Sequence, residues 1–288
     1  MTEILVTGSR GLIGCALVAA LTAAGRQVST LDRDAGDITD ESTWSNAPRA
    51  DVVIHLAARS YVPQSWAEPA AFVDTNVVGT MRALDYSLRH GARVVLASSY
   101  LYGTPKRLPI HESDPLDPTN PYALSKRLAE ACCRFHAERH GLPVVILRPF
   151  NVYGPRQPAD FLIPSIIGQA IGGVEIRVKD LEPRRDYVHV DDVAAAFAAA
   201  VLAPAEGLAV YNIGGGASRS VGDVIEAVQS ALGTTLPVHS DGERRPGEIP
   251  ETLADISAAA SGLGWKPAVS FEAGIADLCR RATSSTVA

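Results

Sequence analysis

Cysteine, lysine and long hydrophobic runs are all scarce in this chain of 288 residues. Its four cysteines show no metal-ligand spacing, so we expect reduced thiols and no bound metal. They are Cys15, Cys132, Cys133 and Cys279. The longest apolar run, Val193–Ala203, is too short to cross a bilayer. The first residues lack the basic segment of a signal peptide, so we expect no membrane anchor and no export, and a cytoplasmic location.

Excess positive charge is also absent. The chain has 26 lysines and arginines against 32 aspartates and glutamates, which gives a net charge of −6. This balance provides no general attraction to a phosphodiester backbone, so we expect no nucleic-acid partner. Neighbouring arginines at Arg184–Arg185 and Arg244–Arg245 still offer local sites for a small anion.

Short apolar runs alternate with alanine- and leucine-rich stretches over the first half of the chain. The runs begin at Ile4, Gln27, Asp51, Arg93 and Pro143. Their continuity predicts strands that are buried on both faces. The stretches between them predict helices at Leu12–Ala24, Ala70–His90 and Pro121–His140. This alternation predicts an α/β fold with a doubly wound parallel sheet of the Rossmann type.

The pattern loosens after about residue 153. Clusters of glycine and proline occur there, interrupted by a helical stretch at Val190–Leu202. We therefore expect residues 1–153 to form the sheet domain, with residues 186–212 or so returning to it. Residues 154–185 and 213–288 are expected to form a smaller, interleaved C-terminal lobe.

Three glycines follow the first predicted strand, in the segment TGSRGLIG. Gly8, Gly11 and Gly14 open a helix, where glycines allow a tight turn and close approach of a pyrophosphate to backbone N–H groups. Asp32 ends the second predicted strand and suits a carboxylate that binds the adenosine ribose. An acid there would repel the 2′-phosphate of NADP, so the pattern favours NAD, although neighbouring Arg33 leaves NADP open.

One of the four lysines follows a tyrosine by four residues, in NPYALSK. With eight tyrosines in the chain, this spacing is expected by chance roughly 0.1 times. On a helix it places Tyr122 and Lys126 on one face, where the ammonium would lower the pKa of the phenol. Asn120 can cap this helix and Pro121 suits its first turn, so the helix dipole would act in the same direction. The pair predicts a tyrosine base, although a surface tyrosine beside a solvated lysine has the same spacing.

Ten short motifs are spread over nearly the whole chain. They are TGSRGLIG, GDITD, HLAA, NVVGT, SSYLYG, NPYALSK, RPFNVYGPRQ, RRDYVHVDDV, RRPGE and GWKP. Their order resembles that of the extended short-chain dehydrogenases/reductases. Within these the chain is most similar to the nucleotide-sugar epimerase/dehydratase branch, which includes UDP-galactose 4-epimerase. The resemblance implies hydride transfer between NAD and a nucleotide diphosphate sugar.

The resemblance also implies a role for each matching position. Ser98, Tyr122 and Lys126 correspond to the catalytic residues, with Tyr122 as the base. The positions that would line NAD are Gly8, Arg10, Gly11, Leu12, Ile13, Gly14, Asp32, Asp37, Ile38, Leu56, Ala57, Ala58, Asn76 and Pro149, together with Tyr122 and Lys126. The positions that would hold the sugar nucleotide are Ser98, Asn151, Arg185, Arg245 and Glu248. The arginines would face the diphosphate, because guanidinium groups bind phosphate oxygens well, and the acid would face the nucleoside.

Two positions depart from the related dehydratases. Those enzymes resemble this chain but carry acidic residues where it has Ser99 and Tyr100. Elimination of water from a 4-keto sugar lacks its usual acid and base without these carboxylates, so dehydratase activity is not expected.

Three functions remain as hypotheses. The first is an NAD-dependent epimerase of a UDP-, GDP- or dTDP-hexose, acting at C4 through a transient 4-keto sugar. The second is a reductase of a 4-keto-6-deoxy sugar nucleotide, because DLEPRRDYVHV and RRPGEIP also resemble GDP-4-keto-6-deoxymannose reductases. The third is a non-catalytic NAD-binding protein. The resemblance further implies a homodimer that pairs the helices at Ala70–His90 and Pro121–His140.

Overall fold

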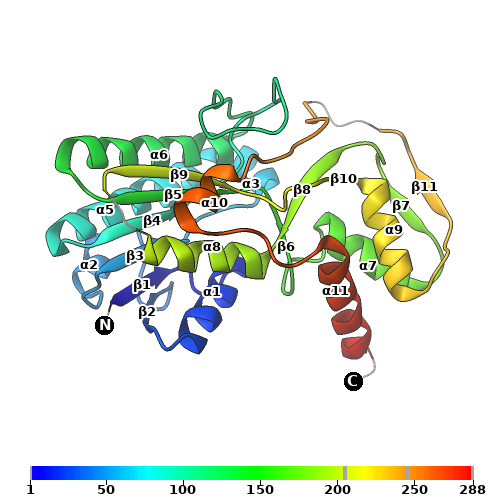
Figure 1. Cartoon of the computed structure of the whole chain (residues 1–288), viewed down its shortest axis with the longest axis horizontal. Coiled ribbons are helices and arrows are strands. Elements are labelled where there is room, and N and C mark those ends of the chain that lie inside the picture. Colours follow the sequence, from blue (N-terminus) through cyan, green and yellow to red (C-terminus); the bar gives the residue numbers. More distant parts are fainter. Residues whose placement is uncertain (1, 204–205, 244–246, 287–288) are drawn as a thin grey trace.

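A computed structural model describes residues 2–203, 206–243 and 247–286 of the chain. Six strands form one parallel sheet in the order β2-β1-β3-β4-β5-β9 (Figure 1). They are β1 Glu3–Thr7, β2 Gln27–Leu31, β3 Val52–His55, β4 Arg93–Ala97, β5 Val144–Pro149 and β9 Leu208–Ile213. Every residue of β3 and β5 is buried, as the continuous apolar runs predict.

Helices cover both faces of this sheet. On one face α1 (Leu12–Ala23) packs beside α8 (Val190–Leu202), and on the other α5 (Gly79–His90) packs beside α6 (Pro121–His140) (Figure 1). Successive side chains of a strand point to opposite faces, and β4 shows this alternation. Val95 joins the core beneath α1 and α8, whereas its neighbour Leu96 joins the core beneath α5 and α6. The prediction of an α/β doubly wound sheet is confirmed.

The predicted helix at Ala70–His90 is interrupted in the structure. It consists of α4 (Pro69–Val73), a turn of wider π-helix, η1 (Asp74–Val78), and α5. Such turns occur frequently at functional sites, and this one carries Asn76. The remaining short helices around the sheet are α2 Glu41–Ser45, α3 Val62–Ala67 and α10 Ser257–Leu263.

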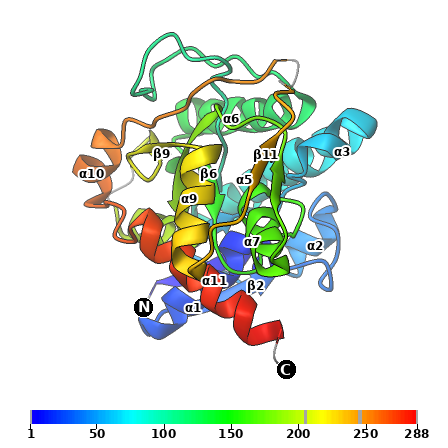
Figure 2. The same cartoon turned by 90° about the vertical axis from the view of Figure 1, so that its right-hand side faces the viewer.

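A second group of elements packs around a core of its own (Figure 2). Three short strands, β6 (Asn151–Tyr153), β8 (Arg184–His189) and β10 (Ser218–Ser220), form one small sheet. Two more form a pair, namely β7 Ile176–Val178 and β11 Val238–Ser240. The helices of this group are α7 Leu162–Gly172, α9 Val221–Leu232 and α11 Phe271–Thr286. Between these elements the chain returns to the large sheet as α8 and β9, while the exact domain boundaries stay a prediction.

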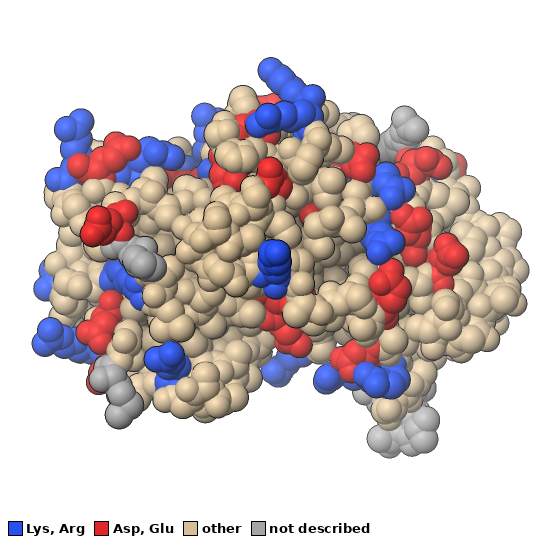
Figure 3. All heavy atoms as spheres, in the orientation of Figure 1, with Lys and Arg blue, Asp and Glu red and all other residues tan. Residues whose placement is uncertain are grey.

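Acidic and basic side chains lie interspersed over the face of the molecule shown in Figure 3, rather than gathered into a basic patch. Among the described residues, no helix is long and apolar enough to cross a membrane.

The tight turn after β1 generates a testable prediction about stability. A methyl group on Gly14, in α1, would press into the backbone of Gly8 and Ser9. We expect Gly14→Ala to lower the free energy of unfolding by about 1–3 kcal/mol, because overpacking against backbone is poorly relieved. Gly168 also lies within a helix, but a methyl group there would meet no described atom within 4 Å beyond its chain neighbours and the backbone of its own helix. Gly168→Ala should therefore raise the free energy of unfolding by about 0.5–1 kcal/mol. Equal effects of the two changes in urea denaturation would contradict the prediction.

Candidate active site

The glycine turn lies where the strand order of the large sheet reverses. β2 lies on one side of β1 and β3 on the other, and ligands of such sheets bind in the crevice at the carboxyl ends of these strands. Gly8 has a left-handed backbone (φ 70°), and a Cβ atom there would lie 2.7 Å from the backbone nitrogen of Ala57. Gly11 is the N-cap residue of α1. The backbone thus forms a side-chain-free cradle at a helix start, which fits a dinucleotide pyrophosphate.

Asp32 lies beside this cradle, at the end of β2. Its side chain is 8% exposed, accepts a hydrogen bond from the Ser9 hydroxyl and lies 3.8 Å from Nε of Arg10. The guanidinium of Arg10 also donates to Asp34 at 2.5 Å, which lowers the pKa of that carboxyl. The structure therefore places Asp32 and Arg10 together at the glycine turn. Ser9 was not predicted, although it lies within the glycine motif.

Asp37 and Ile38 follow on the chain and differ in environment. Asp37 is exposed and accepts hydrogen bonds from the backbone N–H and the hydroxyl of Thr39, which lower its pKa. Ile38 is buried in the core with Trp44, whose indole donates to the carbonyl of Ile38 at 2.8 Å. Of the two, only Asp37 presents its side chain to solvent.

The predicted residues Leu56, Ala57 and Ala58 follow the end of β3, opposite the glycine turn. The hydroxyl of Thr7 accepts from the backbone N–H of Ala57 at 3.2 Å and is bonded to Nδ1 of His55 at 2.8 Å. Burial lowers the pKa of His55 to about 3, so the imidazole is neutral. Thr7 and His55 thus tie the ends of β1 and β3 together, a role that the sequence patterns did not reveal.

Asn76 connects this edge of the sheet to α6. Its amide oxygen accepts from the backbone N–H of Arg59 at 2.8 Å, and its amide nitrogen donates to the Arg59 carbonyl at 3.0 Å. The same nitrogen donates to the hydroxyl of Ser125 at 2.8 Å, between Tyr122 and Lys126. Asn76 therefore joins the loop after β3 to the helix that carries the predicted base.

Helix α6 begins as the sequence predicts. The Asn120 side chain accepts from the backbone N–H of Ala123 at 2.9 Å, and Pro121 occupies the first turn. Tyr122 is partly exposed, contacts Phe72 edge-on at a ring distance of 6.3 Å, and is hydrogen bonded to the side chain of Ser99. The last contact brings the phenol to the loop that carries Ser98.

Ser98 follows β4 and is anchored by its backbone. Its N–H donates to the carbonyl of Leu147 in β5 at 2.8 Å. Its hydroxyl is buried and makes no hydrogen bond to the described part of the chain. Because a buried hydroxyl without a partner is costly, this atom suits a ligand hydroxyl. Pro149, at the end of β5, is buried beside the same edge.

The pKa shifts of Tyr122 and Lys126 differ from the prediction. Desolvation raises the pKa of Tyr122, and the hydrogen bond with Ser99 only partly opposes it. Lys126 is 3% exposed, and burial lowers its pKa to about 8, although the charge of Glu130 acts in the opposite direction. The expected lowering of the phenol pKa is therefore not found in this structure, because desolvation determines the direction of the shift.

The residues predicted to hold the sugar nucleotide come from the small sheet and the segment after β11. Asn151 donates to the carbonyl of Asp186 at 3.4 Å. Arg185 forms an ion pair with Glu248 and donates to the carbonyl of Ile249 at 2.7 Å. Arg185 and Glu248 are thus brought together, whereas Arg245 lies outside the described residues.

Tyr100 lies between the catalytic residues and the residues predicted to hold the sugar nucleotide. Its hydroxyl donates to the carbonyl of Gly103 at 2.5 Å, and its ring packs edge-on against Phe150. Burial raises the pKa of Tyr100, while the nearby charge of Arg185 acts against this rise. An aromatic wall therefore connects the Ser98 loop to Arg185, at the position where the related dehydratases carry an acid.

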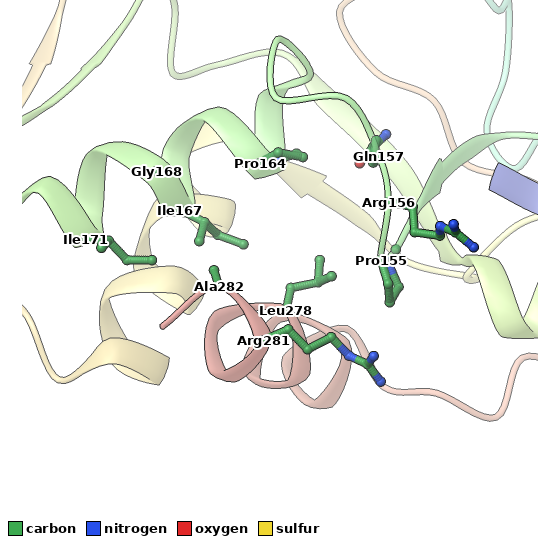
Figure 4. Close-up of a pocket in the computed structure, with 11 residues that line it drawn as sticks. Pro155, Arg156, Gln157, Pro164, Ile167, Gly168, Ile171, Leu278, Arg281 and Ala282 are labelled. Atoms are coloured by element: carbon green, nitrogen blue, oxygen red, sulfur yellow. The ribbon is translucent and has the colours of Figure 1, made fainter. Parts of the chain in front are cut away.

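Two cavities lie away from these residues. One of about 530 Å³ lies between α7, α11 and the loop after β6, where Ile167 and Ile171 face Leu278 and Ala282 (Figure 4). The other, of about 300 Å³, is lined by polar groups that include Arg219. Neither contains a predicted site residue, so the candidate site lies along the edge of the sheet. No group of three or more metal-ligating side chains is found among the residues described.

A doubly wound sheet with a glycine turn at its strand-order reversal, and with Ser98, Tyr122 and Lys126 at the same edge, is the architecture of the short-chain dehydrogenases/reductases. The chain belongs to the NAD dependent epimerase/dehydratase family, whose model matches residues 4–214. The prediction of NAD as the cofactor is confirmed, because the family is NAD-dependent.

Three relatives illustrate this similarity. The UDP-glucose 4-epimerase of Halalkalibacterium halodurans is 34% identical over an alignment that covers 92% of this chain and 90% of the relative. The GDP-6-deoxy-D-mannose reductase of Pseudomonas aeruginosa is 31% identical, with 94% of each chain covered. The structure of the Thermotoga maritima UDP-glucose 4-epimerase with UDP-glucose is 29% identical and superimposes with a TM-score of 0.90, covering 99% of both chains.

The buried lysine generates a second prediction. We expect Lys126 to lose its proton at a pH of about 8, below the ordinary value of 10.5. Between these values the unfolded chain binds more protons than the folded one, so the stability contributed by this group rises with pH across that window. Since the chain has four lysines, NMR of isotopically labelled lysine would give few signals. The signal that disappears in the Lys126→Arg variant is that of Lys126. A titration midpoint near 10.5 for this signal would contradict the prediction.

Proposed function

We propose that the protein is an NAD-dependent epimerase of a nucleotide diphosphate hexose and inverts the configuration at C4. The observation that carries this proposal is the junction between α6 and the loop after β4. There Tyr122 meets the loop of Ser98, whose buried hydroxyl has no partner among the described residues, and neither Ser99 nor Tyr100 supplies a carboxylate. Such a site supports reversible oxidation of a carbinol and lacks the groups needed to eliminate water.

In the proposed reaction Ser98 donates or accepts a hydrogen bond at the C4 hydroxyl, while Tyr122 accepts the proton of that hydroxyl. When bound, NAD would supply the acceptor for the hydride of C4 and would carry a positive charge. Burial raises the pKa of Tyr122, so base action would require a positive charge near the phenol, and Lys126 lies one turn further along α6. The 4-keto sugar then turns over, Tyr122 returns the proton to the oxygen, and the hydride returns to the other face of C4.

The diphosphate would be held by Arg185, as proposed from the family pattern. In the structure its guanidinium is satisfied by Glu248 and by the carbonyl of Ile249. Phosphate oxygens are strong acceptors for a guanidinium fork, so the diphosphate can replace the carboxylate on Arg185. Glu248 would then be released toward the ribose hydroxyls of the nucleoside. Arg245 is proposed as the second cation for the diphosphate.

A reductase of 4-keto-6-deoxy sugar nucleotides is the second candidate. The similarity to the GDP-6-deoxy-D-mannose reductase of Pseudomonas aeruginosa favours it, because that relative is nearly as similar as the epimerases. A reductase consumes one reduced cofactor for each turnover, whereas an epimerase returns its cofactor unchanged. A non-catalytic NAD-binding protein, the third hypothesis, is disfavoured by the desolvated Tyr122 and Lys126, since a binding module has no use for them.

We also propose that two copies associate through α5 and α6. Helix α6 exposes Leu124, Leu128 and Phe135, which are 45%, 40% and 55% accessible. Their spacing places them on one side of the helix, and an exposed apolar face of this kind favours an interface. Ala131 is exposed on the same side of α6, whereas Cys132 is half-buried and packs against the core beneath α5 and α6.

The phenol of Tyr122 provides the test of the proposed reaction. We expect Tyr122→Phe to reduce epimerisation by at least about a hundredfold, because the C4 hydroxyl loses its proton acceptor. Binding of NAD should persist, since the ring and the glycine turn are unchanged, and equilibrium dialysis measures it. Tyr211→Phe, in β9 outside the site, is the matched control and should keep wild-type activity. Full turnover by Tyr122→Phe would eliminate the proposed mechanism.

A further inference from the structure

Arg148 is bonded to both elements that carry the predicted catalytic residues. It lies in β5, is 3% exposed, and its Nε and Nη2 donate to the two oxygens of Glu130 at 2.9 and 2.6 Å. Its Nη1 donates to the hydroxyl of Tyr102 at 2.8 Å. Glu130 lies on α6 one turn beyond Lys126, and Tyr102 lies in the loop that begins at Ser98. A single guanidinium therefore joins the helix of the base to the loop of the serine.

We propose that Arg148 and Glu130 are positioning residues for the catalytic site. The buried pair fixes α6 against the Ser98 loop, and it places the carboxylate of Glu130 one helical turn from Lys126. The kinetic test of this inference rests on the proposed function, whereas the NMR test does not.

The loop after Ser98 is held in place by further hydrogen bonds to β9 and to Arg148. The Tyr102 hydroxyl donates to the amide oxygen of Asn212 in β9 at 2.6 Å, and the Arg148 guanidinium lies over the Tyr102 ring at 5.2 Å. The backbone N–H of Asn212 donates to Glu112 at 2.7 Å, and Arg148 also donates to the Glu112 carbonyl at 3.1 Å. Fixing Arg148 thereby fixes the whole segment after Ser98. A buried network in which each member is bonded to at least one other favours a single geometry.

The charges around Lys126 point to the second part of the role. Glu130 and Cys133 face it from α6, and His55, from β3, also senses its charge. His55 is neutral, and burial raises the pKa of the Cys133 thiol, so Glu130 is the anion that acts on Lys126. Arg148 in turn balances Glu130, because a buried carboxylate needs a bonded partner. Glu130 thus pairs with Arg148 and also acts electrostatically on Lys126.

The test compares two glutamates of the same helix. Glu130→Gln keeps the shape of the side chain and removes its charge, and Glu138→Gln does the same at an exposed site, where Glu138 is paired with Arg134 at 3.7 Å. The lysine NMR titration is the readout, since it requires no turnover. We expect Glu130→Gln to lower the titration midpoint of Lys126 by about 1 pH unit, because an opposite charge near an ammonium favours its protonated form. Glu138→Gln should leave the midpoint unchanged.

An unchanged midpoint in a folded Glu130→Gln protein would overturn the inference and leave the pair a purely structural feature. If this variant does not fold, the double variant Glu130→Gln/Arg148→Met removes both charges together, and a smaller fall in midpoint is expected, because loss of the nearby cation partly offsets loss of the anion. With a substrate in hand, kcat should fall at least tenfold in Glu130→Gln while KM changes little, and a change in KM alone would contradict positioning. If the wild type turns over no nucleotide sugar, the proposed function fails, but the NMR comparison still decides the role of Glu130.

Discussion

The site depends on one constraint, namely that the six strands of the large sheet run in the same direction. Parallel strands are joined by crossover connections, which return the chain to the same edge before each new strand, so the carboxyl ends of all six strands lie at one edge. The glycine turn follows β1, Asp32 follows β2, Leu56 follows β3 and Ser98 follows β4. Helix α6 then brings Tyr122 to this edge from the next crossover. Residues that are distant in the sequence become neighbours because the strands and the helix that carry them end or begin at this edge.

The burial that stabilises this arrangement also determines its electrostatics. Lys126 is placed among side chains that exclude water, which lowers its pKa to about 8, and the same desolvation raises the pKa of Tyr122. The ion pair of Arg148 and Glu130 lies beside them and costs desolvation of its own, which its bidentate hydrogen bonds offset. The charged groups therefore follow one another as Arg148, Glu130 and Lys126. The proposed proton transfer at Tyr122 would take place within this arrangement.

The large sheet could be predicted from sequence because its strands are continuous apolar runs. β1 to β5 and the helices α1 and α6 match the expected segments to within a few residues. The three-residue strands β6, β7, β10 and β11 could not be found in this way, since they are short and partly exposed, and β9 was overlooked although Leu208–Ile213 is largely apolar. A run of three residues shows too little periodicity to distinguish a strand from a loop.

In the candidate site, too, some features could be predicted from the sequence and others could not. Motif spacing indicates which residues share a face, and the cap of α6 at Asn120 follows from it. Spacing carries no information about desolvation, which is why the sign of the pKa shift at Tyr122 was wrong. The contact of Arg148 with Glu130 joins residues 18 apart on different elements, so only the folded chain reveals it. The i, i+4 relation of Lys126 and Glu130 was visible in the sequence and is the signal that could have found this network.

The account rests on a hydride that leaves C4 and returns to it. The most direct measurement follows a nucleotide hexose carrying deuterium at C4, incubated with the protein and NAD and analysed by NMR, across UDP, GDP and dTDP sugars. The proposed mechanism predicts a mixture of the two C4 epimers that retain the deuterium at C4, with no net consumption of cofactor. Loss of the deuterium from C4, or reduction of a 4-keto sugar with stoichiometric consumption of NADPH in place of epimerisation, would contradict it.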